Sequence, residues 1–230
     1  MEGAAAPRLD QGKSRAGLDH DERLVKDGIL RMGSLVETQI RDSVRAIVER
    51  DGRLAQQIID ADERINDAQR EVGDLIVMTI ATQAPVARDL RFLMALDHVA
   101  FELERIGDHA SSIAKQVRHL QETAPLREVA DVATIGYLAA DLVRGIVTAL
   151  IDIDDRLARD VALRDDEIDH GYRTDFARVI EAMRTDPQSV DGGTRLILAA
   201  HWIERIGDRV TNVAEDVVYL ATGRIEDLNP

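Results

Sequence analysis

Two pairs of carboxylates with the same spacing are the residues of this chain best suited to chemistry. Each pair lies within the pentapeptide Glu-Arg-Ile-Gly-Asp, which occurs at 104–108 and again 100 positions later, at 204–208. Glu104 and Asp108 are four residues apart, as are Glu204 and Asp208, so each pair shares one face of a helix. Two carboxylates on one face can converge on one cation, and oxygen ligands suit Mg²⁺, Ca²⁺, Mn²⁺ or iron. The spacing therefore predicts one cation site in each copy.

Further polar residues gather in two other periodic segments, around Ile65 and around Ile168. If these segments pack antiparallel beside the pentapeptide helices, their acids face the two carboxylate pairs. Facing carboxylates repel one another unless a cation or a basic side chain neutralises them. We expect the acids among these residues to help bind the cations. The residues are Asp62, Glu63, Asn66 and Asp67 in the first segment, and Asp165, Asp166, Asp169 and His170 in the second.

Two other interpretations compete with a cation site. In the first, each pair binds a neighbouring arginine, Arg105 or Arg205, in surface salt bridges that stabilise by about 0–1 kcal/mol each. In the second, the chain is a catalytic di-iron bundle, which needs a Glu-x-x-His motif from each of two helices. Only Glu167 and His170 form such a motif. The sequence therefore disfavours a di-iron oxidase and leaves the other two interpretations open.

Composition excludes several classes of protein. The chain has no cysteine, which rules out disulfides, thiolate metal sites and a thiol nucleophile. It contains neither a phosphate-binding P-loop nor a Gly-x-Ser-x-Gly motif, and we predict that it is not an enzyme. Its 29 basic and 43 acidic residues give a net charge of −14, which argues against binding to nucleic acid or to anionic lipid. We expect contact with a membrane only through partner proteins.

The elements that position these residues are predicted to be helices. Hydrophobic residues make up 45% of the chain but aromatic residues only 3%, so the core must be aliphatic, which suits helix packing. Apolar residues recur near a 3.6-residue period in six long segments. These segments cover 20–50, 52–82, 86–121, 126–153, 155–184 and 193–222. The pattern predicts an all-α fold of six long helices, arranged as two tandem three-helix bundles related by a pseudo-two-fold repeat.

The repeat also indicates where the domains begin and end. We assign residues 1–19 to a flexible N-terminal tail, 20–122 to the first three-helix repeat and 125–223 to the second. Thr123-Ala124-Pro125 is the expected linker between the repeats. The first 19 residues lack the apolar region of a signal peptide, and no run of about 20 apolar residues occurs. We therefore expect a cytoplasmic protein.

Each pentapeptide carries a glycine inside a helical stretch. Glycine in a helix interior costs about 1 kcal/mol relative to alanine, so a compensating reason is expected. Gly107 and Gly207 both fall on the inward-facing stripe of their helices. We predict that both lie at close helix crossings, where a side chain would push the neighbouring helix away.

The repeated segments resemble those of a known family. The sequences Leu-Glu-Arg-Ile-Gly-Asp-His-Ala and Ile-Glu-Arg-Ile-Gly-Asp-Arg-Val, at 103–110 and 203–210, are similar to segments of the PhoU family of phosphate-transport accessory proteins. In that family they lie on the last helix of each of two tandem three-helix repeats. Residues 83–92, Gln-Ala-Pro-Val-Ala-Arg-Asp-Leu-Arg-Phe, resemble the family's segment leading into the third helix. Residues 211–215 and 219–223 resemble its C-terminal end, and the likeness covers about 20–225.

This resemblance implies a cytoplasmic bacterial regulator of phosphate uptake. PhoU proteins repress the phosphate-starvation response when phosphate is plentiful. The partners implied are the ATPase subunit of the phosphate ABC transporter and a phosphate-sensing histidine kinase. A homodimer is implied as well. On this basis we expect a non-enzymatic negative regulator that links the transporter to the kinase.

The resemblance also implies iron or zinc clusters held by Glu/Asp-x-x-x-Asp motifs, with Mg²⁺, Ca²⁺ and Mn²⁺ as alternatives. Carried over residue by residue, the motifs fall on Glu104 with Asp108, Glu204 with Asp208, Asp165 with Asp169, and Asp62 with Asn66. Asparagine is a neutral and weaker ligand, so the first site could instead recruit Glu63 or Asp67. Arg209 replaces the histidine expected after Asp208, whereas His109 keeps it after Asp108. The second site therefore carries an extra positive charge.

Two alternatives from other functional classes stay open. The chain could be a metal-free helical adaptor whose acidic faces bind basic partner surfaces. It could also be a helical bundle that stores metal. Metal analysis of protein purified without added salts separates the metal-free adaptor from the metal-binding regulator and from the metal-storage bundle.

Overall fold

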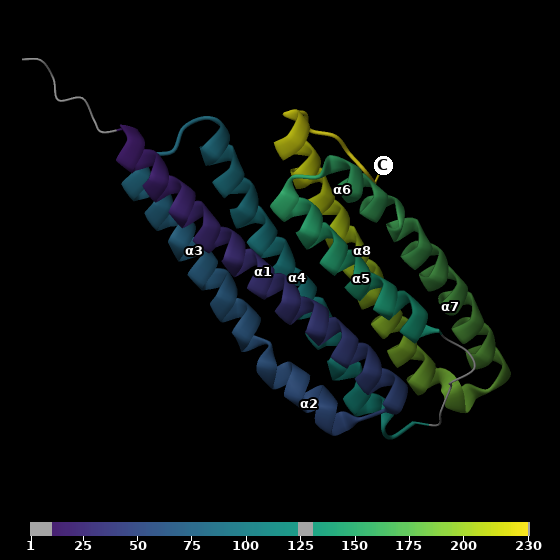
Figure 1. Cartoon of the computed structure of the whole chain (residues 1–230). Helices are drawn as coiled ribbons and strands as arrows, with labels where there is room; N and C mark the ends of the chain where they lie inside the picture. The colour runs from purple at the N-terminus through teal and green to yellow at the C-terminus, as the bar shows by residue number, and fades with distance from the viewer. Residues whose placement is uncertain (1–10, 124–130, 230) are drawn as a thin grey trace, which may run out of the picture.

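The fold is built from helices throughout the part that can be described. The computed structural model describes residues 11–123 and 131–229, and no strand occurs in these two ranges. The all-α prediction is confirmed. The molecule is elongated, with the long helices lying nearly side by side (Figure 1). The helices are α1 (Gln11–Glu49), α2 (Gly52–Ala61), α3 (Glu63–Gln83), α4 (Arg88–Leu120), α5 (Val132–Asp152), α6 (Asp155–Leu163), α7 (Asp165–Thr185), the 3₁₀ helix η1 (Pro187–Ser189) and α8 (Val190–Thr222).

Four long helices form a closed ring of contacts at the centre. Helix α1 packs against α4, α4 against α8, α8 against α5, and α5 against α1. Helices α2 and α3 cover α1 and α4 on one flank, while α6 and α7 cover α5 and α8 on the other (Figure 1). The buried aliphatic residues of both halves form one continuous core. The two three-helix units are therefore fused into a single bundle.

Close packing between the halves depends on small residues in α1 and α5. A Cβ added to Gly33 of α1 would lie 2.9 Å from Cγ2 of Val147 in α5. In the reverse direction, a Cβ on Gly136 of α5 would collide with the side chain of Val44 in α1. Because each glycine receives a valine from the other half, the two helix backbones approach closely.

The second and fifth expected helices are each divided by a short break. Residues 52–82 become α2 and α3, which meet at Asp62, and 155–184 become α6 and α7, which meet at Arg164. At both breaks the chain makes tight bonds between residues three apart, from Ile65 N to Asp62 O (2.9 Å) and from Glu167 N to Arg164 O (3.1 Å). Such 3₁₀-type turns inside a helical segment bend it without ending it. The apolar periodicity continues across both breaks, which is why the sequence predicts single helices.

Equivalent turns join the first and second segments of each half. Arg50 and Ile153 both have a left-handed backbone, with φ of 55° and 52°. The next residue caps the following helix in each case: Asp51 accepts hydrogen bonds from Arg53 N and Leu54 N, and Asp154 does so from Arg156 N and Leu157 N. Both aspartates are therefore N-terminal caps of the helices that follow them. The two turns lie 103 residues apart, which fixes the register between the halves.

The N-terminal helix begins earlier than the sequence indicates. The expected tail covered 1–19, but α1 starts at Gln11. Leu18 is buried, and Arg15 forms an ion pair with Asp89 of α4 (2.6 Å), so this part of the chain is fixed against the bundle. Residues 1–10 lie outside the described part, as do 124–130, where the expected linker and the start of the fourth helix fall.

Helix α5 is the most apolar helix of the described chain. It is the one described helix whose length and composition suit a membrane span, yet 56% of its most apolar window is buried inside the bundle. Its apolar side chains pack against α1 and α8, as expected of a core helix. At the end of the fold, α8 stops at Gly223, whose left-handed φ of 73° suits a C-terminal glycine cap.

Candidate metal centre and the seam between the repeats

Each pentapeptide glycine lies against the bent helix of its own half. Gly107 and Gly207 are buried. A Cβ on Gly107 would lie 3.0 Å from Cδ1 of Ile65, and a Cβ on Gly207 would collide with the carboxylate of Asp165. The two glycines thus let α3 and α7 approach α4 and α8 just beside the breaks. The prediction of close crossings at both glycines is confirmed.

Four carboxylates come together in the second half. Asp165 and Asp169 lie on α7, beside Glu204 and Asp208 on α8. The residue Asp165 is only 6% exposed, and its pKa is raised to about 7 by burial and by the charges of Asp169 and Asp208. Burial, followed by the charge of Asp208, also raises the pKa of Glu204. Because the charges of Asp169 and Asp208 raise the pKa of both Asp165 and Glu204, we treat the four acids as one electrostatic unit, which we name the second acidic site.

The hydrogen bonds of this site leave two buried oxygens without a partner. Arg205 binds Asp208 (3.0 Å), Arg173 binds Asp169 (2.9 Å) and His201 approaches Glu204 (3.3 Å). Oδ1 of Asp165 and Oε2 of Glu204 have no hydrogen-bond partner within the described chain. Buried carboxylate oxygens are seldom left unsatisfied, and these two can accept a bond from a proton-bearing group, a water molecule or a cation.

The first half carries a smaller set of acids, which we name the first acidic site. Arg105 binds Asp108 (3.1 Å) and lies 3.5 Å from Glu104, so the predicted salt-bridge alternative is present here as well. Burial and the charge of Asp108 raise the pKa of Glu104, whose Oε2 has no partner among the described residues. Asp67 takes no part, because it turns outward to Arg70 (2.6 Å).

A glutamine from α1 distinguishes the first acidic site from the second. Nε2 of Gln39 donates a hydrogen bond to Oδ1 of Asp62 (2.9 Å). The offset of 103 residues places Leu142 at the matching position in α5 and Asp165 at that of Asp62. The aspartate at this position therefore has an amide partner in the first half, whereas its buried counterpart Asp165 has none from α5. Gln39 was not expected at the site from the sequence, although a polar residue within an apolar helical stripe is a signal that points to it.

Both sites have suitable donors for a hard cation, but the side chains are arranged for ion pairs. Within 11–123 and 131–229, no three His, Asp or Glu side chains are grouped so as to hold one ion. Asp208 would have to leave Arg205, and Asp108 would have to leave Arg105, before either could ligate. Of the unsatisfied oxygens, Oε2 of Glu204 lies 3.3 Å from His201 and Oε2 of Glu104 lies 3.5 Å from Arg105, so within the described chain Oδ1 of Asp165 is the one that fits a cation without such a change.

Helices α4 and α8 meet between the two acidic sites along a line that we call the seam. Two pairs of side chains cross it at positions related by the repeat. Arg209 lies 3.3 Å from Glu102, whose side chain is only 8% exposed, and His109 stacks on Trp202 with ring centroids 5.2 Å apart. Burial and the charges of Arg209 and Arg205 lower the pKa of His109 to about 4, so it is neutral near pH 7. His109 thus belongs to the seam as an apolar contact.

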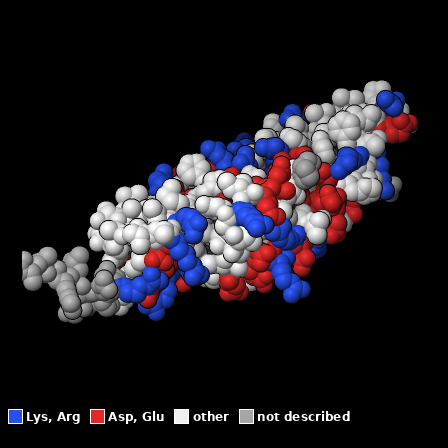
Figure 2. All heavy atoms as spheres, turned by 90° about the horizontal axis from the view of Figure 1, so that it is seen from above, with Lys and Arg blue, Asp and Glu red and all other residues white. Residues whose placement is uncertain are grey.

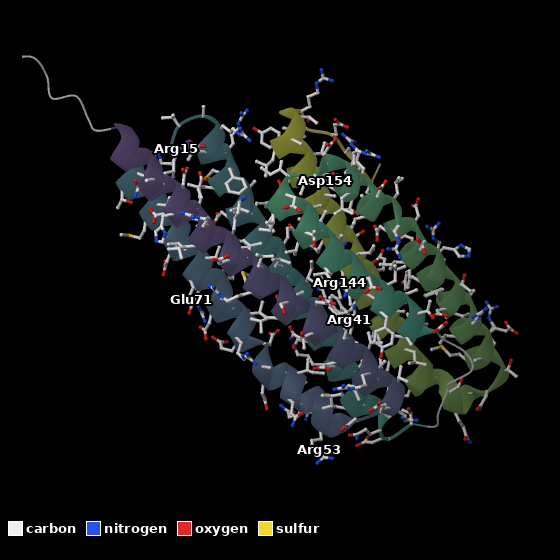
Figure 3. All side chains as sticks on the ribbon, viewed as in Figure 1. Arg15, Arg41, Arg53, Glu71, Arg144 and Asp154 are labelled. Atoms are coloured by element: carbon white, nitrogen blue, oxygen red, sulfur yellow. The ribbon has the colours of Figure 1, made fainter. Side chains whose placement is uncertain are left out.

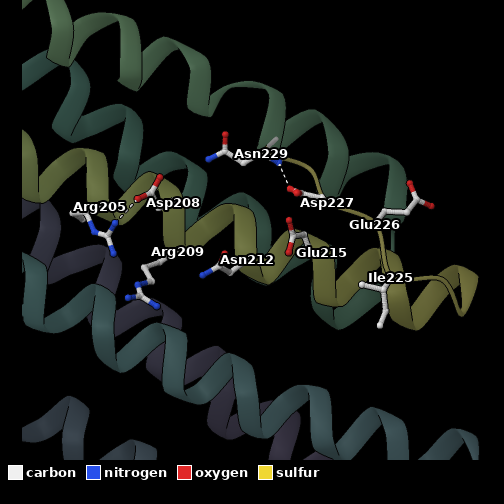
Figure 4. A pocket seen from close by; sticks show the side chains of 9 residues that line it. All are labelled: Arg205, Asp208, Arg209, Asn212, Glu215, Ile225, Glu226, Asp227 and Asn229. Atoms are coloured by element: carbon white, nitrogen blue, oxygen red, sulfur yellow. Dashed lines mark hydrogen bonds and ion pairs between the residues drawn. The ribbon is translucent and has the colours of Figure 1, made fainter.

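A cleft opens beside the second acidic site, at the C-terminal end of the chain. It has a volume of about 530 Å³ and runs from Arg205 and Asp208 on α8 to residues 225–229, which fold back along the helix (Figure 4). Leu228 N donates to Oε1 of Glu215 (3.0 Å), and Glu226 binds Arg159 of α6 (2.9 Å). These contacts hold the last residues beside the second acidic site.

The repeated geometry is matched by a repeated family domain. The PhoU domain matches this chain twice, at residues 29–117 and 132–217. The chain belongs to the PhoU family. The resemblance read from the pentapeptides is confirmed, and with it the prediction that the chain is not an enzyme, because PhoU proteins are accessory and regulatory proteins.

Several PhoU proteins are similar over most of their length. The "Phosphate-specific transport system accessory protein PhoU homolog" of Clostridium acetobutylicum is 35% identical over 202 residues, covering 87% of this chain and 92% of that protein. The protein of the same description from Pseudomonas putida is 37% identical over 200 residues, covering 86% and 78%. Sequence similarity of this extent includes both repeats.

Crystal structures of PhoU proteins share the fold. PhoU from Pseudomonas aeruginosa aligns with a TM-score of 0.84 and 34% identity, covering 90% of this chain and 99% of that one. The phosphate transport system regulatory protein PhoU from Streptococcus pneumoniae aligns with a TM-score of 0.85 and 28% identity, covering 91% and 99%. The six-segment, two-repeat PhoU architecture is thus found along nearly the whole chain.

Proposed function

We propose that this protein is a non-enzymatic negative regulator of phosphate uptake. In this role it lowers the phosphate-starvation response when phosphate is plentiful, by linking a phosphate ABC transporter to a phosphate-sensing histidine kinase in the cytoplasm. The observation that carries the proposal is the double PhoU-domain match, together with relatives that are described as phosphate-specific transport system accessory proteins.

The surface of the bundle is suited to docking proteins. Acidic and basic side chains are interleaved over the face seen in Figure 2, and the long helices offer extended, rigid surfaces. Mixed charge of this kind favours specific partners through complementary pairing. The ATPase subunit of the transporter and the kinase are the partners that we propose, with a second copy of the chain as a homodimer.

Deleting the gene tests the regulatory role. We expect phosphate-starvation genes to be switched on in phosphate-rich medium, and expression of the wild-type chain to restore repression. If those genes stay silent at high phosphate after deletion, the protein is not their negative regulator.

A pull-down from membranes of phosphate-replete cells tests the partners. The tagged chain should retain the transporter's ATPase subunit and the kinase, while a tagged unrelated helical protein of similar charge should not. Absence of both partners would contradict the link between them. Light scattering of the purified chain tests the homodimer, which requires about twice the monomer mass of 25.5 kDa.

We further propose that the acidic sites bind metal, as an iron or zinc cluster or as Mg²⁺, Ca²⁺ or Mn²⁺. The proposal is supported by the unsatisfied buried oxygens of Asp165, Glu204 and Glu104. Asp165, Asp169, Glu204 and Asp208 would hold metal in the second half, and Glu104, Asp108 and Asp62 in the first. A bound cation would neutralise carboxylates that otherwise repel one another.

Elemental analysis after growth with added iron or zinc tests this proposal. Changing Glu204 and Asp208 to alanine should halve the bound metal if both sites load equally. A matched control changes Glu71 and Asp74, two exposed acids of α3, and should leave the metal content unchanged. If the wild-type chain holds no metal under these conditions, the acids form salt bridges only and the protein is a metal-free adaptor. If the wild-type chain holds metal but binds neither the transporter nor the kinase, metal storage becomes the better interpretation.

A further inference from the structure

A second cleft lies at the end of the bundle where α1 begins. It has a volume of about 480 Å³ and is bordered by α1, the first turn of α4, and the ends of α5 and α8. In Figure 3, Arg15 marks this end of the molecule and Arg53 the opposite end. The charged residues that line the cleft are Arg15, Lys26, Arg88 and Arg91, with Glu22 and Asp89. The cleft thus has a basic excess in a chain whose net charge is −14.

A single ion pair within the cleft neutralises one of its two acids and one of its four bases. Arg15 binds Asp89 at 2.6 Å. Among the residues that the structure describes, no carboxylate forms an ion pair with Lys26, Arg88 or Arg91. What distinguishes these three bases is their position, since they line one cleft and their charges can act on the same anion.

The ammonium of Lys26 is held in position by neutral groups. Its Nζ donates a hydrogen bond to the carbonyl oxygen of Ile151 (3.3 Å) and lies 5.0 Å from the centre of the Phe92 ring. Both contacts favour a cation without neutralising it. The charge of Lys26 therefore stays available to a bound anion.

One acid in the cleft opposes an anion. Glu22 is partly buried, and its Oε1 has no partner within the described chain. Burial and the charge of Asp89 raise its pKa, although Arg15 and Lys26 act in the opposite direction. Removing the charge of Glu22 should therefore strengthen anion binding, whereas removing a base should weaken it.

We propose that this cleft binds a phosphate-bearing anion through Lys26, Arg88 and Arg91. The planar guanidinium group matches the oxygens of a phosphate in a two-point contact, and Lys26 adds a point charge. The volume of about 480 Å³ lies within the range of roughly 300–1,000 Å³ found for small-molecule sites. It accommodates inorganic phosphate or the phosphate group of a nucleotide. The binding requires neither the acidic sites nor a protein partner.

Calorimetric titration of the full chain tests the proposal, with inorganic phosphate and ATP as separate probes at constant ionic strength. Changing Arg88 and Arg91 together to glutamine should lower the affinity at least about tenfold, because two charge-assisted contacts are lost. Glu22→Gln should raise the affinity, by about threefold if the carboxylate is partly screened. Arg53→Gln, which removes one positive charge at the far end of the molecule, should change nothing.

The two probes distinguish the free phosphate ion from a phosphate group on a larger molecule. Binding of inorganic phosphate identifies the free ion as sufficient, and binding of ATP alone identifies a phosphate group on a larger molecule. The proposal is overturned if neither probe binds, or if Arg53→Gln weakens binding as much as the cleft variant does. Because Glu22→Gln acts in the opposite direction, a general loss of folding cannot imitate the expected pattern. Failure here would leave the gene-deletion test of the regulatory role unaffected.

Discussion

Replacing Asp165 with asparagine removes a charge from the second acidic site and should stabilise the metal-free protein above neutral pH. The pKa of this carboxyl rises from its ordinary value of 3.8 to about 7. Each pKa unit corresponds to about 1.4 kcal/mol, so the charged form is disfavoured by at most about 4 kcal/mol. Partial access of water to the site reduces this penalty, so we expect Asp165→Asn to stabilise the folded protein by about 2 kcal/mol.

The direction in which the stability changes with pH follows from proton binding to Asp165. The folded protein holds this proton between about pH 4 and pH 7, where the unfolded chain has released it. The stability that Asp165 contributes is therefore complete below about pH 4 and is lost as the pH rises through about 7. Asparagine has the same shape and stays neutral, so it avoids this loss.

Thermal unfolding in the presence of a chelator measures the effect, with Trp202, the single tryptophan, as a fluorescent probe. For a chain of this size, about 2 kcal/mol corresponds to roughly 4–8 °C in Tm. Asp165→Asn should unfold that much later than wild type at about pH 8, and the two should converge towards about pH 4. Asp62→Asn is the matched control, since Gln39 already satisfies that carboxylate, and it should bring no gain. The reasoning is refuted if Asp165→Asn unfolds at or below the wild-type temperature at the higher pH.

Three further substitutions test the packing. Gly207→Ala should destabilise by about 1–3 kcal/mol in chemical denaturation, because the added methyl would collide with Asp165; wild-type stability would place the two helices further apart. Arg209→Met should cost up to about 3 kcal/mol, because it leaves the buried carboxylate of Glu102 only the longer contacts with His98 (3.5 Å) and Asn212 (3.4 Å), and Arg209→Lys should recover part of this. Ala87→Gly should stabilise by about 1 kcal/mol, since Ala87 has a φ of 46° that strains a side chain; a lower Tm would show that its conformation is unstrained.

The sequence predicts the helical class and the close crossings because both follow from local patterns. Apolar periodicity marks the helix faces, and an unexpected glycine on an inward stripe marks a neighbour at short distance. Asp51 could be recognised as a cap because it stands directly before a periodic segment. Each of these signals needs only a few residues on either side.

The contacts between distant segments could not be read in this way. The bond from Gln39 to Asp62 requires the offset between α1 and α3, which the fold alone supplies. The stack of His109 on Trp202 depends on the antiparallel register of α4 and α8, from different repeats. His109 therefore looked like a neighbour of the metal motif when read along its own helix. The breaks at Asp62 and Arg164 were hidden for a related reason, since the apolar stripe runs through both.

The extent of the acidic sites was also only partly predictable. The spacing of Glu204 and Asp208 indicated a shared face, Asp165 and Asp169 were expected opposite them, and the fold brings the four acids together. Helical spacing alone did not show that Asp67 pairs with Arg70. Whether an acid turns inward depends on the bend of its helix, which becomes visible only in three dimensions.

The unlike pairs across the seam have a consequence for how the chain assembles. The repeat relates Glu102 to Trp202 and His109 to Arg209, so each half carries one member of each pair. If two copies of the first half met in the same way, the buried Glu102 would face a histidine, and two copies of the second half would set Trp202 against an arginine. Only the union of unlike halves gives Glu102 a partner that is charged at every physiological pH. The seam therefore disfavours the pairing of like halves from two molecules and favours the pairing of unlike halves, which a single chain supplies by folding on itself.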